Sequence, residues 1–514
     1  MELKLQSIDE QSFWKEKAYR IPSYDVAAVR ERTKSKPRWL HFGAGNIFRG
    51  FIAGLQEELL EKGLTDTGII AADTFDTDII QKIYRPYDNL TVLVMLGTDG
   101  VPQKRVIASV AEAIEADGSK KRQMDRLKEI FADPGLEMIS FTITEKGYAG
   151  SAMTLVTEML YERFQKNAAP IAMVSMDNCS RNGEKLREAV LSIAEKMVLD
   201  RQAEPAFLCY VSDEKQVAFP WSMIDKITPR PAEAVAEMLR KDGLTGMNPI
   251  ITNGNTYIAP YVNAEIPQYL VIEDRFPNGR PPLEEAGVYF ADKKTVSAAE
   301  RMKVTTCLNP LHTALAVFGC LLGYDSIAAE MRALELSTLV RRMGYEEGMP
   351  VVTDPGVISP KVFLEEVLNE RLPNPYIPDT PQRIACDTSQ KVAIRFGETL
   401  KAYQKTGIKT PGELTYIPLV LAGWLRYLVG LDDNLQKMEL SSDPMRKELT
   451  EIFEMFQCSG EKNVHEILEP VLSDEKLFGL NLYEAGLGEK IEGMFVELLN
   501  GKGAVKRTLQ KYCI

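Results

Sequence analysis

Short apolar runs separated by polar turns characterise the first half of the chain. Runs of this length, rich in β-branched and aromatic residues, predict buried strands of a parallel sheet. They occupy residues 39–42, 68–72, 138–143 and 171–176, and the runs at 207–211 and 269–272 are candidates to extend the sheet. Residues 90–96 and 105–110 are predicted as further strands. Between them, segments 47–62 and 121–131 have the apolar spacing of amphipathic helices.

From about residue 297 onward the pattern changes, because apolar residues recur at helical spacing and strand-like runs nearly vanish. The helical segments are 311–322, 326–339, 360–369, 390–403, 417–429 and 447–456. The second part of the chain is therefore predicted to be mainly α-helical.

The first apolar run leads into a glycine-rich turn. Residues 39–51 read WLHFGAGNIFRGF, so Gly43 and Gly45 follow the strand directly and a helix begins near Asn46. A strand, a glycine turn and a helix N-terminus form the usual start of a dinucleotide-binding unit, in which the helix N-terminus holds a pyrophosphate. Phe48 stands where the common fingerprint has its third glycine, and a plain strand–helix turn is the alternative interpretation.

An acidic residue follows the next predicted strand. Asp73 lies about 20–30 positions past the glycines, where a carboxylate binds the ribose hydroxyls of a dinucleotide. Asp76 and Asp78 compete for this role, or one of them caps the helix that follows. Acidic residues here favour NAD over NADP, because they repel a 2′-phosphate; NADP remains possible.

These patterns predict an α/β fold in two parts. Residues 1–295 are assigned to an N-terminal Rossmann-like dinucleotide-binding domain, and residues 296–514 to a mainly α-helical C-terminal domain that carries substrate and catalytic residues.

Composition excludes several classes of function. The net charge is −12 and no basic cluster stands out, which argues against a nucleic-acid partner. The seven cysteines are scattered without a CxxC pair, which indicates free thiols in a reducing compartment. Residues 1–30 lack the apolar core of a signal peptide, and the most apolar segment, 416–429, is too short to span a bilayer. We expect a cytoplasmic protein with a small-molecule partner.

The segment 300–315, ERMKVTTCLNPLHTAL, contains the candidate chemistry of the second part. Lys303 lies among apolar neighbours, and desolvation of a lysine makes it a usable general base. The Asn309 amide is suited to donate to a reacting oxygen, and His312 to orient it. The alternative is that Asn309 caps a helix beginning at Pro310. The chain has only three histidines, so no metal site is predicted.

Several blocks of the sequence resemble one family, the long-chain polyol dehydrogenases, which include mannitol 2-dehydrogenase and the hexuronate reductases. Together they span roughly residues 38–430. The similar blocks are His41–Gly45 with Arg49, FTITEKGY at 141–148, Ser175–Asn178 with Asn182-Gly183, FPWSMIDKITP at 219–229, residues 274–287, Lys303 with Asn309 and His312, and residues 374–387 with Asp379, Arg383 and Asp387.

The resemblance implies metal-independent hydride transfer between NAD(P) and a secondary alcohol or ketone of an open-chain sugar. Lys303 matches the general acid/base, Asn178 and Asn309 the pair that holds the reacting oxygen, and His312 a substrate-orienting residue. Arg383 and Asp225 match substrate contacts, and Glu300 a carboxylate that assists proton exit. The cofactor positions are Gly43, Gly45, Asn46, Phe48, Arg49, Asp73, Asp76, Thr144 and Glu145. The structural alternatives are an ion pair for Asp225, a clamping role for Arg383 and a helix cap at Asn178.

One departure from the family concerns spacing. Lys303 and Asn309 are six positions apart, whereas the family has five. On a continuous α-helix one extra residue rotates the lysine by roughly 100°. Either a loop or bulge absorbs this residue, or Lys303 is displaced.

Three substrate pairs fit the resemblance: mannitol with fructose, mannonate with fructuronate, and altronate with tagaturonate. A carboxylate substrate requires a cationic group near Lys303, and Lys146 and Lys226 are the candidates. The alternatives are a mannitol-1-phosphate-type dehydrogenase and a non-catalytic NAD-binding sensor of the same fold.

Overall fold

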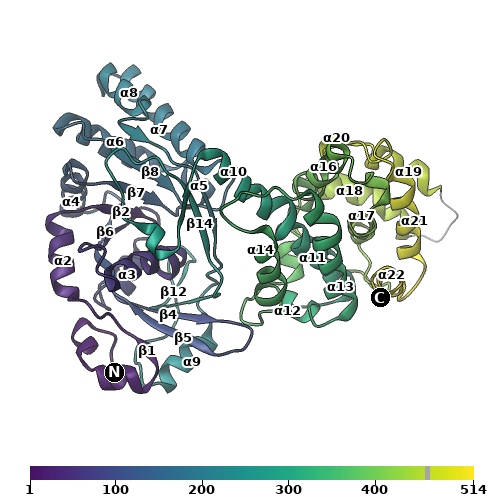
Figure 1. Cartoon of the computed structure of the whole chain (residues 1–514), viewed down its shortest axis with the longest axis horizontal. Coiled ribbons are helices and arrows are strands. Elements are labelled where there is room, and N and C mark those ends of the chain that lie inside the picture. The colour runs from purple at the N-terminus through teal and green to yellow at the C-terminus, as the bar shows by residue number, and fades with distance from the viewer. Residues whose placement is uncertain (458–462) are drawn as a thin grey trace. The chain divides into compact units, whose positions relative to one another are not determined.

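A computed structural model describes residues 1–457 and 463–514 of the chain (Figure 1). The chain divides into two compact units, Met1–Ser297 and Ala298–Ile514. The six cysteines within the described ranges are free thiols, and Cys458 lies outside them.

A six-stranded parallel sheet forms the centre of the first unit, in the order β6-β3-β2-β7-β8-β9. The chain thus builds outward from β2 to β3 and β6, then crosses to β7 on the other side of β2. This order confirms the predicted Rossmann-type sheet, whose ligands bind where the strand order reverses. The strands are β2 (Trp39–Phe42), β3 (Ile69–Asp73), β6 (Val110–Glu115), β7 (Met138–Phe141), β8 (Ile171–Ser175) and β9 (Val217–Ala218).

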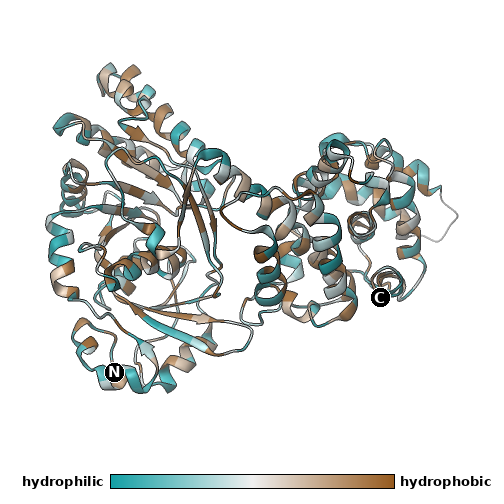
Figure 2. Ribbon diagram, viewed as in Figure 1, coloured by the Kyte–Doolittle hydropathy of each residue, from teal (hydrophilic) through white to brown (hydrophobic). Residues whose placement is uncertain are grey.

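Both faces of this sheet are covered, which explains why its strands are apolar along most of their length (Figure 2). Along β2, Trp39 joins one hydrophobic cluster, whereas Leu40 and Phe42 join another. The first cluster includes residues of α3, and the second includes residues of α4, α6 and α7. Helices of this unit are α1 (Gln11–Glu16), α2 (Val26–Ser35), α3 (Ala53–Glu61), α4 (Lys121–Ala132), α5 (Thr144–Gly147), α6 (Ser151–Lys166), α7 (Asn182–Leu199), α8 (Pro205–Ser212) and α9 (Glu233–Lys241).

Smaller sheets complete the unit, and here two predictions were wrong. The run at 207–211 is not a strand but part of α8, because Pro205 starts a helix that buries Phe207, Tyr210 and Val211 on one side. The run at 269–272 is a strand, but it belongs to the separate sheet β10-β14-β15. The remaining strands are β1 (Tyr19–Arg20), β4 (Thr91–Leu96), β5 (Pro102–Ile107), β10 (Ser222–Asp225), β11 (Ile250–Ile251), β12 (Tyr257–Ile258), β13 (Tyr261–Ala264), β14 (Tyr269–Glu273) and β15 (Tyr289–Ala291).

Buried Arg163 ties the loops around β7 and β8 together. Its guanidinium donates to the carbonyl oxygens of Phe131 and Asp133, each at 2.7 Å, and of Pro170 at 2.9 Å. A buried cation is tolerated here because carbonyl dipoles replace its hydration.

The second unit is helical, as predicted. Helices α11 and α17 are almost wholly buried, and the Glu347 carboxylate caps α17 by accepting the N–H groups of Tyr416 (2.8 Å) and Ile417 (2.7 Å). Its helices, with α10 at the boundary, are α10 (Lys293–Met302), α11 (Asn309–Leu322), α12 (Ile327–Glu330), α13 (Leu334–Arg342), α14 (Pro360–Glu366), α15 (Pro381–Ile384), α16 (Glu398–Thr406), α17 (Tyr416–Leu428), α18 (Arg446–Phe453), α19 (Val464–Leu472), α20 (Glu475–Phe478), α21 (Gly488–Leu499) and α22 (Ala504–Cys513).

One continuous helical stretch, Lys293–Leu322, passes a length and hydropathy test for a membrane span, but 83% of its most apolar window is buried in protein. A buried core helix passes the same test, so this stretch is weak support for a membrane segment.

A buried acid, Glu330 at the end of α12, packs against Gly319 of α11. Glu330 is fully buried, and its carboxyl oxygens have no hydrogen-bond partner among the described residues. It fits only because residue 319 is glycine, where a Cβ atom would lie 2.1 Å from Glu330 Oε1. Burial raises the pKa of Glu330 to about 9.

The folded protein therefore holds a proton on Glu330 that the unfolded chain releases above its ordinary pKa near 4.5. Its contribution to stability is complete below pH 4.5 and falls by roughly 1.4 kcal/mol per pH unit up to about pH 9. Urea unfolding of Glu330→Gln between pH 5 and 9 should show a shallower alkaline loss than the wild type. Glu448→Gln, at an exposed position, is the control; identical slopes for all three proteins would contradict the assignment.

Candidate active site

The glycine turn after β2 lies at the C-terminal edge of the six-stranded sheet. Gly43 has a φ of +104°, and a Cβ atom there would lie 2.2 Å from the Thr142 carbonyl oxygen at the end of β7. Only glycine satisfies both conditions. At Gly45, by contrast, a Cβ atom would meet no atom within 4 Å. The space beside this backbone is open, which fits the approach of a pyrophosphate to a helix that begins at Asn46.

The next side chains of the turn point into the protein. Phe48 stacks on the buried His41 ring, with centroids 4.2 Å apart, and burial lowers the pKa of His41 to about 3. Arg49 is buried and donates to the Ala259 carbonyl oxygen (2.7 Å) and to Asn46 Oδ1 (2.8 Å). Phe48 and Arg49 thus support the turn from within.

The close approach that the third glycine of the fingerprint normally provides occurs two residues later. A Cβ atom at Gly50 would lie 2.7 Å from Val262 Cγ1, and the helix passes through a π-helical turn at Phe48–Ile52. Phe48 is therefore accommodated where the common fingerprint has glycine.

Asp73 ends β3 beside the glycine turn. Its carboxylate accepts the N–H groups of Ala44 (2.9 Å), Phe75 (3.0 Å) and Asp76 (3.1 Å). Burial raises the pKa of Asp73, and these three hydrogen bonds oppose the shift. Asp76 in turn accepts a hydrogen bond from the Thr252 hydroxyl. Both acids lie where the sequence predicts the ribose-binding carboxylate.

The loops after β7 and β8 are linked by one carboxylate. Asp177 accepts the N–H groups of Thr144 (2.9 Å) and Ile143 (3.1 Å) and the hydroxyl of Tyr148 (2.7 Å). These bonds hold Thr144 at a φ of +66°, a conformation that a threonine rarely adopts. Thr144 and Glu145 are exposed, and Glu145 forms an ion pair with Lys185.

The block formed by Ser175–Asn178 and Asn182-Gly183 separates into two parts. Asn178 is exposed directly after β8 and Asp177. Asn182 is buried and donates to the carbonyl oxygens of Asp177 (3.0 Å) and Ser222 (2.9 Å), which joins β8 to β10. Asp225 ends β10 and is 6% exposed. The asparagine suited to contact a substrate is thus Asn178.

In the second unit, Lys303 is 2% exposed and begins a π-helical turn, Lys303–Cys307. The Leu308 N–H donates to the Lys303 carbonyl oxygen at 3.1 Å, five positions back, instead of to the fourth. A π-turn takes up one extra residue within a helix. It therefore accommodates the one extra residue between Lys303 and Asn309. Glu300 lies one turn before Lys303 on α10 and is partly exposed.

His312 lies on the first turn of α11, which begins at Asn309. Its Nε2 atom is 3.5 Å from Asp379 Oδ2 and has no hydrogen-bond partner among the described residues. Burial lowers the pKa of His312 to about 4. The charge of Asp379 raises this pKa, and the charges of nearby arginines lower it. The imidazole is therefore neutral at neutral pH. Asp379 also forms an ion pair with Arg383, whose side chain is 62% exposed.

The structure thus collects the predicted residues at two places. In the first unit the turns with Gly43, Gly45, Asp73, Thr144 and Asn178 follow strands β2, β3, β7 and β8. In the second unit Lys303, Asn309 and His312 follow one another along a helical stretch, with Asp379 and Arg383 beside His312.

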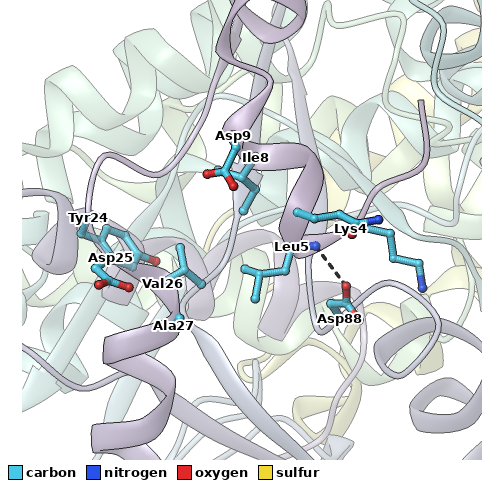
Figure 3. A pocket seen from close by; sticks show the side chains of 10 residues that line it. Lys4, Leu5, Ile8, Asp9, Tyr24, Asp25, Val26, Ala27 and Asp88 are labelled. Atoms are coloured by element: carbon cyan, nitrogen blue, oxygen red, sulfur yellow. Dashed lines mark hydrogen bonds between the residues drawn. The ribbon is translucent and has the colours of Figure 1, made fainter.

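A separate cavity lies in the N-terminal segment (Figure 3). It has a volume of about 780 Å³ and is lined by residues of 4–9 and 24–27 together with Asp88, which accepts the Leu5 N–H at 3.0 Å. None of the predicted site residues lines it.

Comparisons with known proteins agree with this arrangement. Residues 37–285 match the mannitol dehydrogenase Rossmann domain, and residues 295–495 match the mannitol dehydrogenase C-terminal domain. The chain is 50% identical to the D-mannonate oxidoreductase of Thermotoga maritima, over 99% of both chains.

Two solved structures share the fold. One is mannitol 2-dehydrogenase of Pseudomonas fluorescens in a ternary complex with NAD and D-mannitol, with a TM-score of 0.70, 23% identity and 99% of both chains covered. The other is a substrate-free D-sorbitol dehydrogenase, with a TM-score of 0.78, 22% identity and 96% of this chain and 97% of the other covered. The chain therefore belongs to the mannitol dehydrogenase family.

Proposed function

We propose that the protein is a cytoplasmic NAD-dependent dehydrogenase that interconverts D-mannonate and its keto acid, D-fructuronate. The observation that supports this choice of substrate is the 50% identity, over 99% of both chains, to a D-mannonate oxidoreductase. Mannitol with fructose and altronate with tagaturonate are the neighbouring substrate pairs in the family. The non-catalytic sensor loses its main support, because the π-turn after Lys303 accommodates the extra residue.

The residues of the first unit fit a dinucleotide. Gly43 allows the tight turn, Gly45 presents open backbone at a helix N-terminus, and Asp73 ends the neighbouring strand. Asp73 and Asp76 disfavour a 2′-phosphate by charge repulsion, which supports NAD. NAD, when bound, supplies the hydride acceptor for oxidation of the substrate carbon.

Proton transfer belongs to the second unit. In the oxidation direction the substrate hydroxyl gives its proton to the amine of Lys303 and the carbon loses a hydride, so that the C–O bond becomes a carbonyl. The Asn309 amide donates a hydrogen bond to this oxygen as negative charge develops on it. His312, neutral because of its burial, accepts or donates a hydrogen bond to a substrate hydroxyl. Glu300, one turn away on α10, receives the proton that Lys303 releases.

Lys303→Ala tests the catalytic assignment. The reduction of D-fructuronate should slow by about 10²–10⁴-fold, because the carbonyl oxygen loses its proton donor. The dissociation constant for NADH, followed by nucleotide fluorescence, should stay within about twofold of the wild type. Lys405→Ala, at an exposed position of α16, is the control. Full turnover by Lys303→Ala would remove the lysine from the mechanism.

Asp73→Asn tests the cofactor assignment. The ratio of kcat/KM for NADH to that for NADPH should fall by about tenfold, because one unit of charge repulsion against a 2′-phosphate disappears. Asp125→Asn, at an exposed position of α4, is the control. An unchanged ratio in Asp73→Asn would place the ribose contact elsewhere.

A further inference from the structure

In addition to burial, three arginines of the second unit lower the pKa of His312 through their charge. Arg371, Arg383 and Arg395 all act on its imidazole electrostatically. Arg383 is neutralised by its ion pair with Asp379, and Arg371 is 4% exposed. Sequence reasoning assigned no role to Arg395.

Hydrogen bonds place Arg395 beside the first turns of α11. It lies in the π-helical segment Ala393–Gly397, which packs against α11. One guanidinium nitrogen donates to the hydroxyl of Thr313, the residue after His312. Thr313 in turn donates to the Asn309 carbonyl oxygen at 2.9 Å. Arg395 is thus two hydrogen bonds away from the backbone of Asn309.

The charge of Arg395 has no counterion in the part of the chain that the structure describes. Among the described residues, no carboxylate lies within ion-pair distance of its guanidinium, and Glu398, three positions on, is paired with Arg301 at 2.8 Å instead. Burial lowers the pKa of Arg395 to about 10, so it stays protonated at neutral pH. A partly buried cation without a counterion is costly, and an anionic ligand would remove that cost.

The lysines named from the sequence are less suitable. Lys226 Nζ donates to the Glu265 carbonyl oxygen at 2.5 Å, and Lys146 is an exposed residue of α5 in the first unit. Arginine also has a geometric advantage, because its planar fork matches both oxygens of a carboxylate.

We propose that Arg395 binds the carboxylate of the sugar-acid substrate and so selects acids over neutral polyols. The proposal rests on the proposed function, because it assigns the recognition of a carboxylate to the site with Asn309 and His312. The reacting secondary carbon is handled by other residues, so Arg395 determines specificity without taking part in proton transfer.

Arg395→Gln and Arg395→Lys test the proposal, with Arg332→Gln as a matched control that removes an exposed arginine of the same unit. The assays are NADH oxidation with D-fructuronate and with D-fructose, together with NADH binding as a check of folding. In Arg395→Gln, kcat/KM for D-fructuronate should fall by about 10- to 100-fold, mainly through KM. The value for D-fructose should change by less than about threefold. Arg395→Lys should lie in between, because it keeps the charge and loses the fork.

Equal losses for both substrates would mean that Arg395 only supports the fold, and no loss would mean that the carboxylate binds elsewhere. Calorimetric titration of D-mannonate and D-mannitol separates this proposal from the function. If the wild type turns over neither substrate but binds D-mannonate in an Arg395-dependent way, the proposed function fails and the assignment of Arg395 stands. If binding is independent of Arg395, the assignment fails.

Discussion

The contact between Gly43 and the Thr142 carbonyl is the constraint on which the first unit depends. It brings the ends of β2 and β7 so close that no side chain fits between them. The strand order reverses at this pair, since β3 and β6 lie on one side and β7, β8 and β9 on the other. The turns that leave the two strands, together with Asp73 and Asp177, therefore lie at the edge of the sheet where such folds bind their ligands.

Buried polar groups organise the second unit in a comparable way. Glu347 satisfies the N-terminus of α17, and Thr313 connects Arg395 to the first turn of α11. His312 stays neutral because burial and neighbouring arginines outweigh Asp379. A neutral ring on α11 and the guanidinium of Arg395, which is hydrogen-bonded to the next residue, Thr313, suit a substrate that has hydroxyls and one carboxylate. The π-turn at Lys303 completes this arrangement by placing an extra residue without breaking the helix.

Much of the fold could be predicted from local patterns. Strands β2, β3, β4, β7 and β8, the glycine turn and the helical second half follow from apolar periodicity and glycine chemistry, whereas β6 was not predicted. The failures have physical causes. Residues 207–211 have the composition of a strand, but Pro205 and the spacing of the buried side chains favour a helix. The strand at 269–272 was identified, but its sheet depends on long-range pairing with β10.

The site was predictable only in part. The polar character of Lys303, Asn309 and His312 in an apolar run and their family resemblance singled them out, yet the π-turn between them has no signal of its own beyond the extra residue. The inward orientation of Phe48 depends on His41, and that of Arg49 on Ala259. Arg395 could not be recognised, because its partner Thr313 lies 82 positions away and its missing counterion is a property of the packed structure.

The central claim is that this family member reduces a sugar acid with NADH. The most direct test is the rate of NADH oxidation by the wild-type protein with D-fructuronate and D-fructose side by side, repeated with NADPH. We expect rapid turnover of D-fructuronate with NADH and little of D-fructose. Turnover of D-fructose alone would contradict the claim and make the protein a mannitol-type dehydrogenase.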